Sequence, residues 1–335
     1  MALILNQCVL HKLCSFLLFF LLFKPTSANL ITKRVKRLSS PSHDEEKMEG
    51  LSKYVVSIQS RTSHEVFGDN HFCAGVIISK NFILTSAHCT MDKRKIMYRS
   101  RVLSVTAGAE NRLKYRPNIS VSVPVKKVFV PENFTLQNTN NIALMKLGVD
   151  LPTDSQYVGI INLPTTPPQR GLNYTVMGWG RMFKGGPLSE KLLHIDVELL
   201  PWDECDRLLN TFKEEMMCAG NLNNNLDENP CAGDTGGPLV LNETVYGIVS
   251  YRIGCGSKDL PSVYTNVHSH AKWIQETMIE NGCGSLKSFL CLVVASLYCL
   301  VMRNRSMNSF AGFYLIKMII FRPRGHPWRS RRASA

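Results

Sequence analysis

The feature that most constrains the fold of this 335-residue chain is a succession of short β-type runs separated by Gly, Pro, Asn and Asp. The clearest of these runs span residues 54–58, 76–78, 121–123 and 245–249. Runs of this length, punctuated by turn residues, are typical of β-sandwiches and β-barrels. The pattern therefore predicts an all-β fold, and apolar side chains at helical spacing add one helix over residues 270–279.

The N-terminus has the pattern of a secretory signal. His11 and Lys12 precede an apolar run over residues 13–23, and small residues follow at 26–28. A basic start, a short apolar run and a small-residue cleavage site are the three parts of a signal peptide. We expect residues 1–28 to form that signal and to direct the protein into the secretory pathway.

A polar segment over residues 29–50 follows the signal and contains a basic cluster at residues 33–37. We interpret this segment as a pro-segment or linker. Two interpretations of the basic cluster stay open. It is either a site for a secretory endoprotease that cleaves after Arg37, or a solvated run of charge.

The C-terminal part of the chain carries a second apolar stretch. Residues 286–302 are apolar over 17 positions, the lower limit for a membrane-spanning helix. Arg303 and Arg305 follow at once, as the positive-inside tendency expects. We therefore favour a single-pass anchor over a soluble product, with residues 303–335 as a basic tail.

The net charge of +13 comes from the two ends of the chain. Residues 1–37 carry six Lys and Arg and residues 303–335 carry eight, with no acidic residue in either segment. The body, residues 38–302, is near neutral, with 25 basic and 26 acidic residues. A nucleic-acid-binding domain would carry its basic surface on the folded body. We therefore expect protein partners and no nucleic acid.

Sequons and cysteines support a secretory destination. Four N-glycosylation sequons in the body begin at Asn118, Asn133, Asn173 and Asn242. The body also holds seven cysteines, which are Cys73, Cys89, Cys205, Cys218, Cys231, Cys255 and Cys283. In an oxidising compartment disulfides are the default, and an odd number leaves one thiol over. We expect a protein that is secreted or held at the cell surface.

Three short motifs point to a family. They are Leu-Thr-Ser-Ala-His-Cys at residues 84–89, Asn-Ile-Ala-Leu-Met-Lys-Leu at 141–147, and Cys-Ala-Gly-Asp-Thr-Gly-Gly-Pro-Leu at 231–239. Together with Gly-Trp-Gly at 178–180, they resemble the chymotrypsin/trypsin family of serine proteases over about residues 50–280. The resemblance implies a domain over residues 51–282, made of two six-stranded antiparallel β-barrels (about 51–158 and 159–282) and a C-terminal α-helix.

The resemblance places His88, Asn141 and Thr235 where the family has its catalytic imidazole, carboxylate and serine. The carboxylate orients the imidazole and stabilises its charged form, and the same Asp-to-Asn exchange in a family enzyme slows catalysis roughly 10⁴-fold. Such a loss of rate corresponds to an increase of about 5–6 kcal/mol in the activation free energy. At the serine position, Thr235 adds a methyl group where attacking oxygen, imidazole and substrate meet closely. We therefore expect a site without efficient catalysis.

The resemblance also assigns the surrounding positions. Gly233 and the amide of Thr235 match the two donors of the oxyanion hole, and these look spared. The specificity pocket differs from that of a trypsin, because its positions read Asn229, Ser250, Arg252 and Ser262. We expect Arg252 to close the pocket; the alternative is that it swings outward and admits an acidic side chain.

Activation and disulfides complete the set of expectations. Residues 41–44 fall where the family inserts its new N-terminus, and Pro41 offers no comparable terminus. We expect a permanent zymogen-like contact between His71 and Asp234, because a buried carboxylate needs a partner. The resemblance implies the disulfides Cys73–Cys89, Cys205–Cys218 and Cys231–Cys255. Cys283 is then left over, either free or available for an intermolecular bridge.

These observations favour a non-catalytic protease homologue that binds a protein partner. A weak endopeptidase that uses Thr235 as its nucleophile is the first alternative, and an adhesion or receptor ectodomain is the second. The sequence indicates no cofactor and no metal site.

Overall fold

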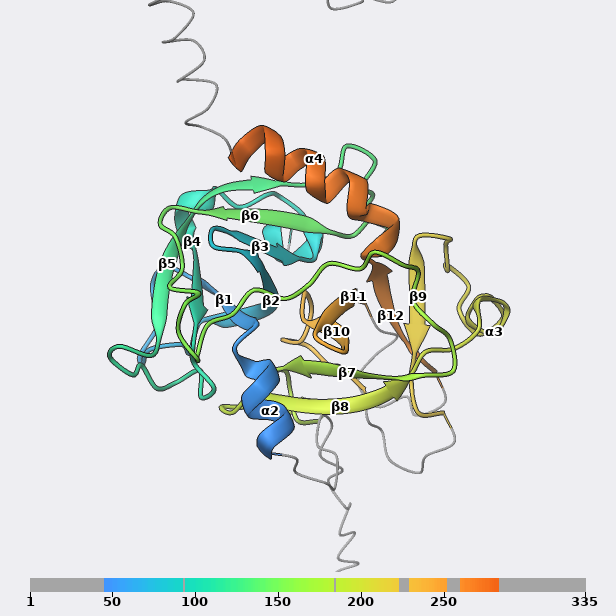
Figure 1. The fold of residues 1–335 in the computed structure, drawn as a ribbon, viewed down its shortest axis with the longest axis horizontal. Coiled ribbons are helices and arrows are strands. Elements are labelled where there is room, and N and C mark those ends of the chain that lie inside the picture. Colours follow the sequence, from blue (N-terminus) through green and yellow to red (C-terminus); the bar gives the residue numbers. More distant parts are fainter. Residues whose placement is uncertain (1–44, 93, 184, 223–228, 252–259, 283–335) are drawn as a thin grey trace, which may run out of the picture. The chain divides into compact units, whose positions relative to one another are not determined.

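The computed structural model describes residues 45–92, 94–183, 185–222, 229–251 and 260–282 (Figure 1). The chain divides into two compact units, residues 1–274 and 275–335. Both β-sheets belong to the first unit, and only the end of one helix is described in the second.

The first sheet closes into a six-stranded antiparallel barrel in the order β1-β2-β3-β6-β5-β4. Its strands are β1 (Val55–Ser60), β2 (His71–Ser79), β3 (Phe82–Thr85), β4 (Leu103–Ala107), β5 (Val121–Phe129) and β6 (Ala143–Leu147). The pairing of β3 with β6 sets Thr85 opposite Ala143. This register brings the residues that follow β3 beside those that precede β6, which is where two of the three motifs lie.

The second sheet has six strands in the order β8-β7-β10-β11-β12-β9. Its strands are β7 (Asn173–Gly178), β8 (Leu193–Glu198), β9 (Met216–Ala219), β10 (Pro238–Leu241), β11 (Thr244–Tyr251) and β12 (Ser262–Asn266). An isolated bridge between Leu199 and Ala219 links its two edges. The two edges meet at this isolated bridge without a continuous strand ladder, so the sheet is a half-barrel beside the closed barrel. The trypsin-like two-barrel fold is confirmed with this refinement.

Helices connect and flank the two sheets. The α-helices are α2 (Glu45–Ser52), α3 (Trp202–Leu208) and α4 (Ala271–Gly282), and the 3-10 helices are η1 (Ala87–Thr90), η2 (Ser100–Val102) and η3 (His268–His270). The helix expected over residues 270–279 is confirmed as α4. Helix α2 was not expected, and it crosses the domain boundary drawn at residue 50.

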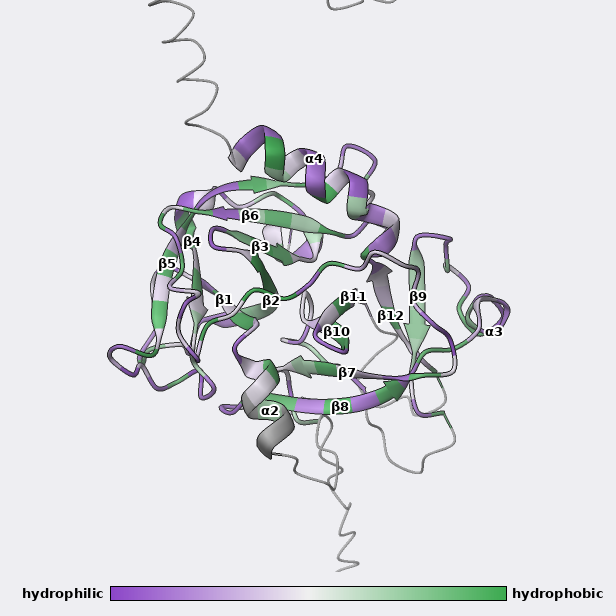
Figure 2. Cartoon of the chain, viewed as in Figure 1, coloured by the Kyte–Doolittle hydropathy of each residue, from purple (hydrophilic) through white to green (hydrophobic). Residues whose placement is uncertain are grey.

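Each sheet has its own apolar core, and the apolar residues follow strands such as β2 and β3 in Figure 2. The barrel core is built from side chains that are almost fully removed from water, among them Ile58, Ile77, Ile83, Val105 and Met145. Burial of this apolar surface is the main driving force for folding.

The disulfides Cys73–Cys89 and Cys205–Cys218 are formed as expected. Cys231 is also disulfide-bonded, while Cys255 and Cys283 lie outside the described residues. All four sequon asparagines (Asn118, Asn133, Asn173 and Asn242) are exposed. The expected signal over 1–28 and anchor over 286–302 also lie outside the described residues. Within those that are described, no helix has the length and apolar character needed to cross a membrane.

Replacement of Ile83 by alanine will test the barrel core. Ile83 is 0% exposed, so the substitution leaves a cavity and should lower the free energy of unfolding by about 2–5 kcal/mol. Val149→Ala is the matched control, because this side chain is 64% exposed and its loss should change stability by less than about 0.5 kcal/mol. Urea unfolding with the disulfides intact measures both. Equal losses in the two variants would contradict the described core.

Candidate functional site

A cavity of about 480 Å³ brings together the motif residues His88, Thr235 and Ser250. Two loops of the first half border it, through Met91, Asp92 and Lys95 on one side and Leu136 and Asn138 on the other. The second half contributes Pro230, Cys231, Ala232, Val249 and Tyr251. The cavity thus occupies the place that the sequence assigned to a catalytic cleft.

Asn141 lies under this cavity and is fully buried. Its Oδ1 accepts hydrogen bonds from the Ser86 hydroxyl at 2.8 Å and from the His88 backbone N–H at 3.0 Å. Its Nδ2 donates to the Ser250 hydroxyl oxygen at 2.7 Å. The amide therefore joins the segment after β3 to strand β11, and it satisfies its own polar atoms without an ionised group.

His88 is held by its backbone, and its ring makes no hydrogen bond to Asn141 or Thr235 among the described residues. The ring packs edge-on against Phe134, with centroids 5.5 Å apart. Its Nε2 is buried and has no hydrogen-bond partner in the part of the chain that the structure describes. Burial lowers the pKa of His88, and the nearby charge of Lys95 lowers it further. The imidazole is therefore held by packing rather than by a hydrogen bond that directs it toward Thr235, and its lowered basicity makes it a poorer general base.

Thr235 sits in a tightly packed turn at the edge of the cavity. Its backbone carbonyl accepts from the Ala74 N–H at 2.9 Å, which ties the turn to strand β2. The following Gly236 has φ +84°, and a Cβ there would lie 2.2 Å from Thr85 Oγ1. The turn can therefore shift little to make room for the extra methyl group of Thr235.

The expected contact between His71 and Asp234 is wrong. The Ser57 hydroxyl donates to His71 Nδ1 at 2.8 Å, and His71 Nε2 donates to the Gly233 carbonyl at 3.1 Å, so both ring nitrogens are engaged elsewhere. Asp234 instead accepts from the backbone N–H groups of Gly180 at 2.7 Å and Cys231 at 2.8 Å. Backbone N–H groups thus stabilise the buried carboxylate, where a contact with His71 was expected.

His71 holds the oxyanion segment through a buried chain of hydrogen bonds. Gln59 Nε2 donates to Ser57 Oγ at 2.9 Å, which leaves the Ser57 hydroxyl hydrogen for His71 and fixes the His71 tautomer. Gly233 has φ +102°, a conformation that favours glycine. This series of hydrogen bonds from the first barrel therefore sets the orientation of the Gly233 carbonyl.

The specificity positions are only partly described. Asn229 is buried, and its Oδ1 accepts from the Ser262 hydroxyl at 3.0 Å, so floor and wall are joined by a neutral hydrogen bond. Ser250 faces Asn141. Arg252, which was expected to close the pocket, lies outside the described residues.

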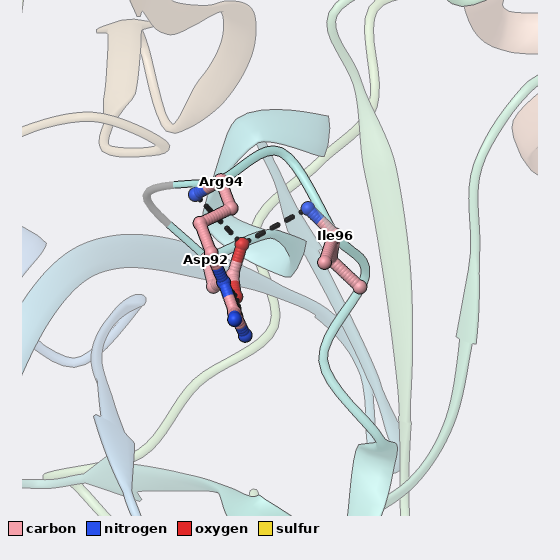
Figure 3. A network of polar contacts seen from close by, with 3 residues as sticks. All are labelled: Asp92, Arg94 and Ile96. Carbon is pink, nitrogen blue, oxygen red and sulfur yellow. Dashed lines mark hydrogen bonds and ion pairs between the residues drawn. The ribbon is translucent and has the colours of Figure 1, made fainter.

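Sequence reasoning missed the loop that presents Lys95 to the cavity. Asp92 accepts from the backbone N–H groups of Arg94 at 2.8 Å and Ile96 at 3.0 Å, and it pairs with the Arg94 guanidinium at 3.0 Å (Figure 3). These donors lower the pKa of Asp92, and the backbone N–H of Ile96 has the largest effect. Aspartate favours turns because its side chain accepts from the backbone N–H two residues on, and this tendency of Asp92 could have identified the loop.

Comparison with known proteins agrees with this geometry. A family model described as Trypsin matches residues 43–274. The chain is 32% identical to Trypsin I-P1 of Gallus gallus over 214 residues, which cover 63% of this chain and 81% of that protein. It is 29% identical to Serine protease 1 of Homo sapiens over 261 residues, or 75% of this chain and 98% of that protein. It is also 32% identical to Ovochymase of Halocynthia roretzi, over 62% of this chain and 13% of that protein.

The buried state of His71 predicts a pH dependence of stability. Burial lowers the pKa of His71 from its ordinary 6.5 to about 3. Below pH 6.5 the unfolded chain therefore binds a proton that the folded chain does not, and stability falls by about 1.4 kcal/mol per pH unit. From pH 7.5 to pH 5.0 we expect a loss of about 2 kcal/mol from this residue.

Urea unfolding of wild type and His71→Gln at the two pH values measures this loss. The variant lacks the titrating group, so its stability should fall by about 2 kcal/mol less than that of the wild type. Other histidines titrate equally in both proteins and cancel in the difference. If both proteins lost the same stability, His71 would not be buried in its neutral form.

Proposed function

We propose that this chain, which belongs to the trypsin family of serine proteases, is a non-catalytic member that binds a polypeptide partner in its cleft without cutting it. The observation that carries the proposal is the Asn141 side chain. It occupies the family's carboxylate position, donates to Ser250, and offers the His88 ring neither a negative charge nor a hydrogen bond among the described residues.

Catalysis in this family needs an imidazole that accepts the nucleophile's proton and then carries a positive charge. His88 is disfavoured in that charged form by burial and by Lys95. Without the carboxylate there is no compensating attraction. Thr235 adds a second obstacle, since its turn is fixed between Ala74 and Thr85. A weak endopeptidase that uses Thr235 would have to overcome both obstacles.

The same cleft keeps features that suit binding. Its volume of about 480 Å³ is within the range of protein ligand sites. The Gly233 carbonyl is held in place by His71, and His88 lines the cavity without a hydrogen bond from its ring to Thr235 among the described residues. A polypeptide carbonyl could accept from the oxyanion-hole amides, because that contact does not require bond cleavage.

We place this binding outside the cell, either at the cell surface or in the extracellular space. The support is the signal pattern over residues 1–28, the disulfides Cys73–Cys89 and Cys205–Cys218, and the exposure of all four sequon asparagines. Disulfides persist in oxidising compartments, and glycans require exposed acceptors. An anchor over residues 286–302 would hold the protein at the surface of the cell.

Restoration of the family residues will test the proposal. We expect wild type and Thr235→Ala to react equally weakly with a fluorophosphonate probe and with a peptide-library substrate. Asn141→Asp with Thr235→Ser should react at least about 100-fold faster than either single variant, because nucleophile, base and acid act as a unit. Wild-type labelling or turnover that disappears in Thr235→Ala would show Thr235 to be a working nucleophile and would overturn the proposal.

Binding in the cleft can be tested without knowledge of the partner. Ala232 is exposed and lines the cavity, so Ala232→Trp should fill it. We expect an immobilised random-peptide library to retain the wild type and Thr235→Ala, and to retain Ala232→Trp at least about tenfold less. Equal retention of all three proteins would favour the alternative hypothesis of an adhesion or receptor ectodomain, in which the cleft takes no part in binding.

A further inference from the structure

The near-neutral body of this protein conceals a strong separation of charge between its two halves. Residues 51–158 contain 14 Lys and Arg against 7 Asp and Glu, whereas residues 159–282 contain 9 against 15. The first half is therefore positive and the second negative. Such an asymmetry creates a directed field that attracts polyanions to one side of a molecule.

Five of the fourteen cations of the first half lie on neighbouring segments at one exposed surface, which we call the basic patch. It consists of Arg61, Arg99, Arg101, Lys126 and Lys127, all of them exposed. Arg61 directly follows β1, and Arg99 directly precedes η2, which contains Arg101. Lys126 and Lys127 belong to β5. None of the five forms an ion pair within the residues that the structure describes.

Hydrogen bonds show that these segments lie against one another. Arg61 donates through its backbone N–H to the Val102 carbonyl at 2.8 Å and through Nη1 to the Arg101 carbonyl at 3.2 Å. The Ser100 hydroxyl donates to the Lys126 carbonyl at 2.9 Å. The cations are thus gathered on neighbouring segments, although they lie up to 66 positions apart in the sequence.

A strand irregularity brings the two lysines to the same side. The register of β5 against β6 shifts between Val125 and Lys127, so an extra residue is inserted in β5. Side chains normally alternate across a strand, but a bulge breaks the alternation. Val125 is buried, while Lys126 and Lys127 are both exposed. The fold therefore doubles the positive charge at this point of the surface.

The chemistry of the basic patch favours a sulfated linear polysaccharide. Guanidinium groups match the paired oxygens of phosphate-like anions, and a row of cations gains affinity by releasing counterions from a densely charged chain. A folded protein partner would need a desolvated apolar or aromatic anchor. The exposed side of β5 carries Ser122, Pro124, Lys126 and Lys127, and Val102 of η2 beside them is 40% exposed. A single small aliphatic side chain among five cations is a weak anchor for a folded protein.

We infer that the basic patch is a binding site for a sulfated polysaccharide of the heparin type. This site is separate from the cleft, so the inference does not depend on the proposed function. It gives the protein a means of being retained in an extracellular matrix whether or not the cleft is occupied.

The test measures binding of the full chain to a fluorescent heparin oligosaccharide as the salt concentration is varied. The variant Arg99→Gln/Arg101→Gln/Lys126→Gln removes three cations of the basic patch. The matched control, Arg170→Gln/Arg207→Gln/Lys213→Gln, removes the same charges from exposed positions of the second half. The basic ends of the chain are the same in all three proteins, so only the differences among them count.

We expect the patch variant to bind at least about tenfold more weakly at physiological salt, and its slope of log affinity against log salt to fall by about 2–3. The control should bind like the wild type, and equal melting temperatures would show that all three are folded. Equal weakening in both variants would mean that net charge alone matters and would overturn the inference. Tighter patch-dependent binding to poly-glutamate than to heparin would overturn it in favour of an acidic protein.

Discussion

The geometry of the cleft depends on the buried side-chain amide of Asn141. Its oxygen holds the Ser86 hydroxyl and the His88 backbone, and its nitrogen donates to Ser250. A carboxylate at this position could only accept, so the Ser250 hydroxyl would have to donate to it. The amide reverses the direction of that hydrogen bond and keeps both of its own polar atoms hydrogen-bonded. The shape of a protease site is therefore preserved without the charge that makes the site work.

The sequence was sufficient to predict the fold, and three of the residues that it singled out, His88, Thr235 and Ser250, line one cavity. Motifs at strand ends identified His88, Asn141 and Thr235, and the structure brings their surroundings together because β3 and β6 pair with Thr85 opposite Ala143. This prediction succeeded because strand register is fixed by the pattern of buried residues. Two disulfides, Cys73–Cys89 and Cys205–Cys218, were implied by the resemblance to the family and are formed.

The sequence could not predict which of several adjacent polar groups would pair. His71 was expected to bind Asp234 and binds the carbonyl of the preceding residue, Gly233. The choice between these neighbours is decided by the orientation of one peptide plane, which spacing does not determine. The hydrogen bonds of Asp92 were missed for a similar reason, because the carboxylate accepts from backbone N–H groups of its own loop and not from another motif. Helix α2 also escaped prediction, since a single short helix has too few turns to show a period.

Helix α2 limits how far an upstream cleavage can act. Its eight residues, Glu45–Ser52, rise about 12 Å along a helix axis, whereas the same residues would span about 26 Å as a strand. The tether between β1 and any new N-terminus in residues 29–44 is therefore about 14 Å shorter than a fully extended one. A new N-terminus can therefore reach less far from β1 than it could if residues 45–52 were extended. Cleavage upstream of β1 would therefore change the contacts that the N-terminus makes outside the fold more readily than the contacts of Asp234.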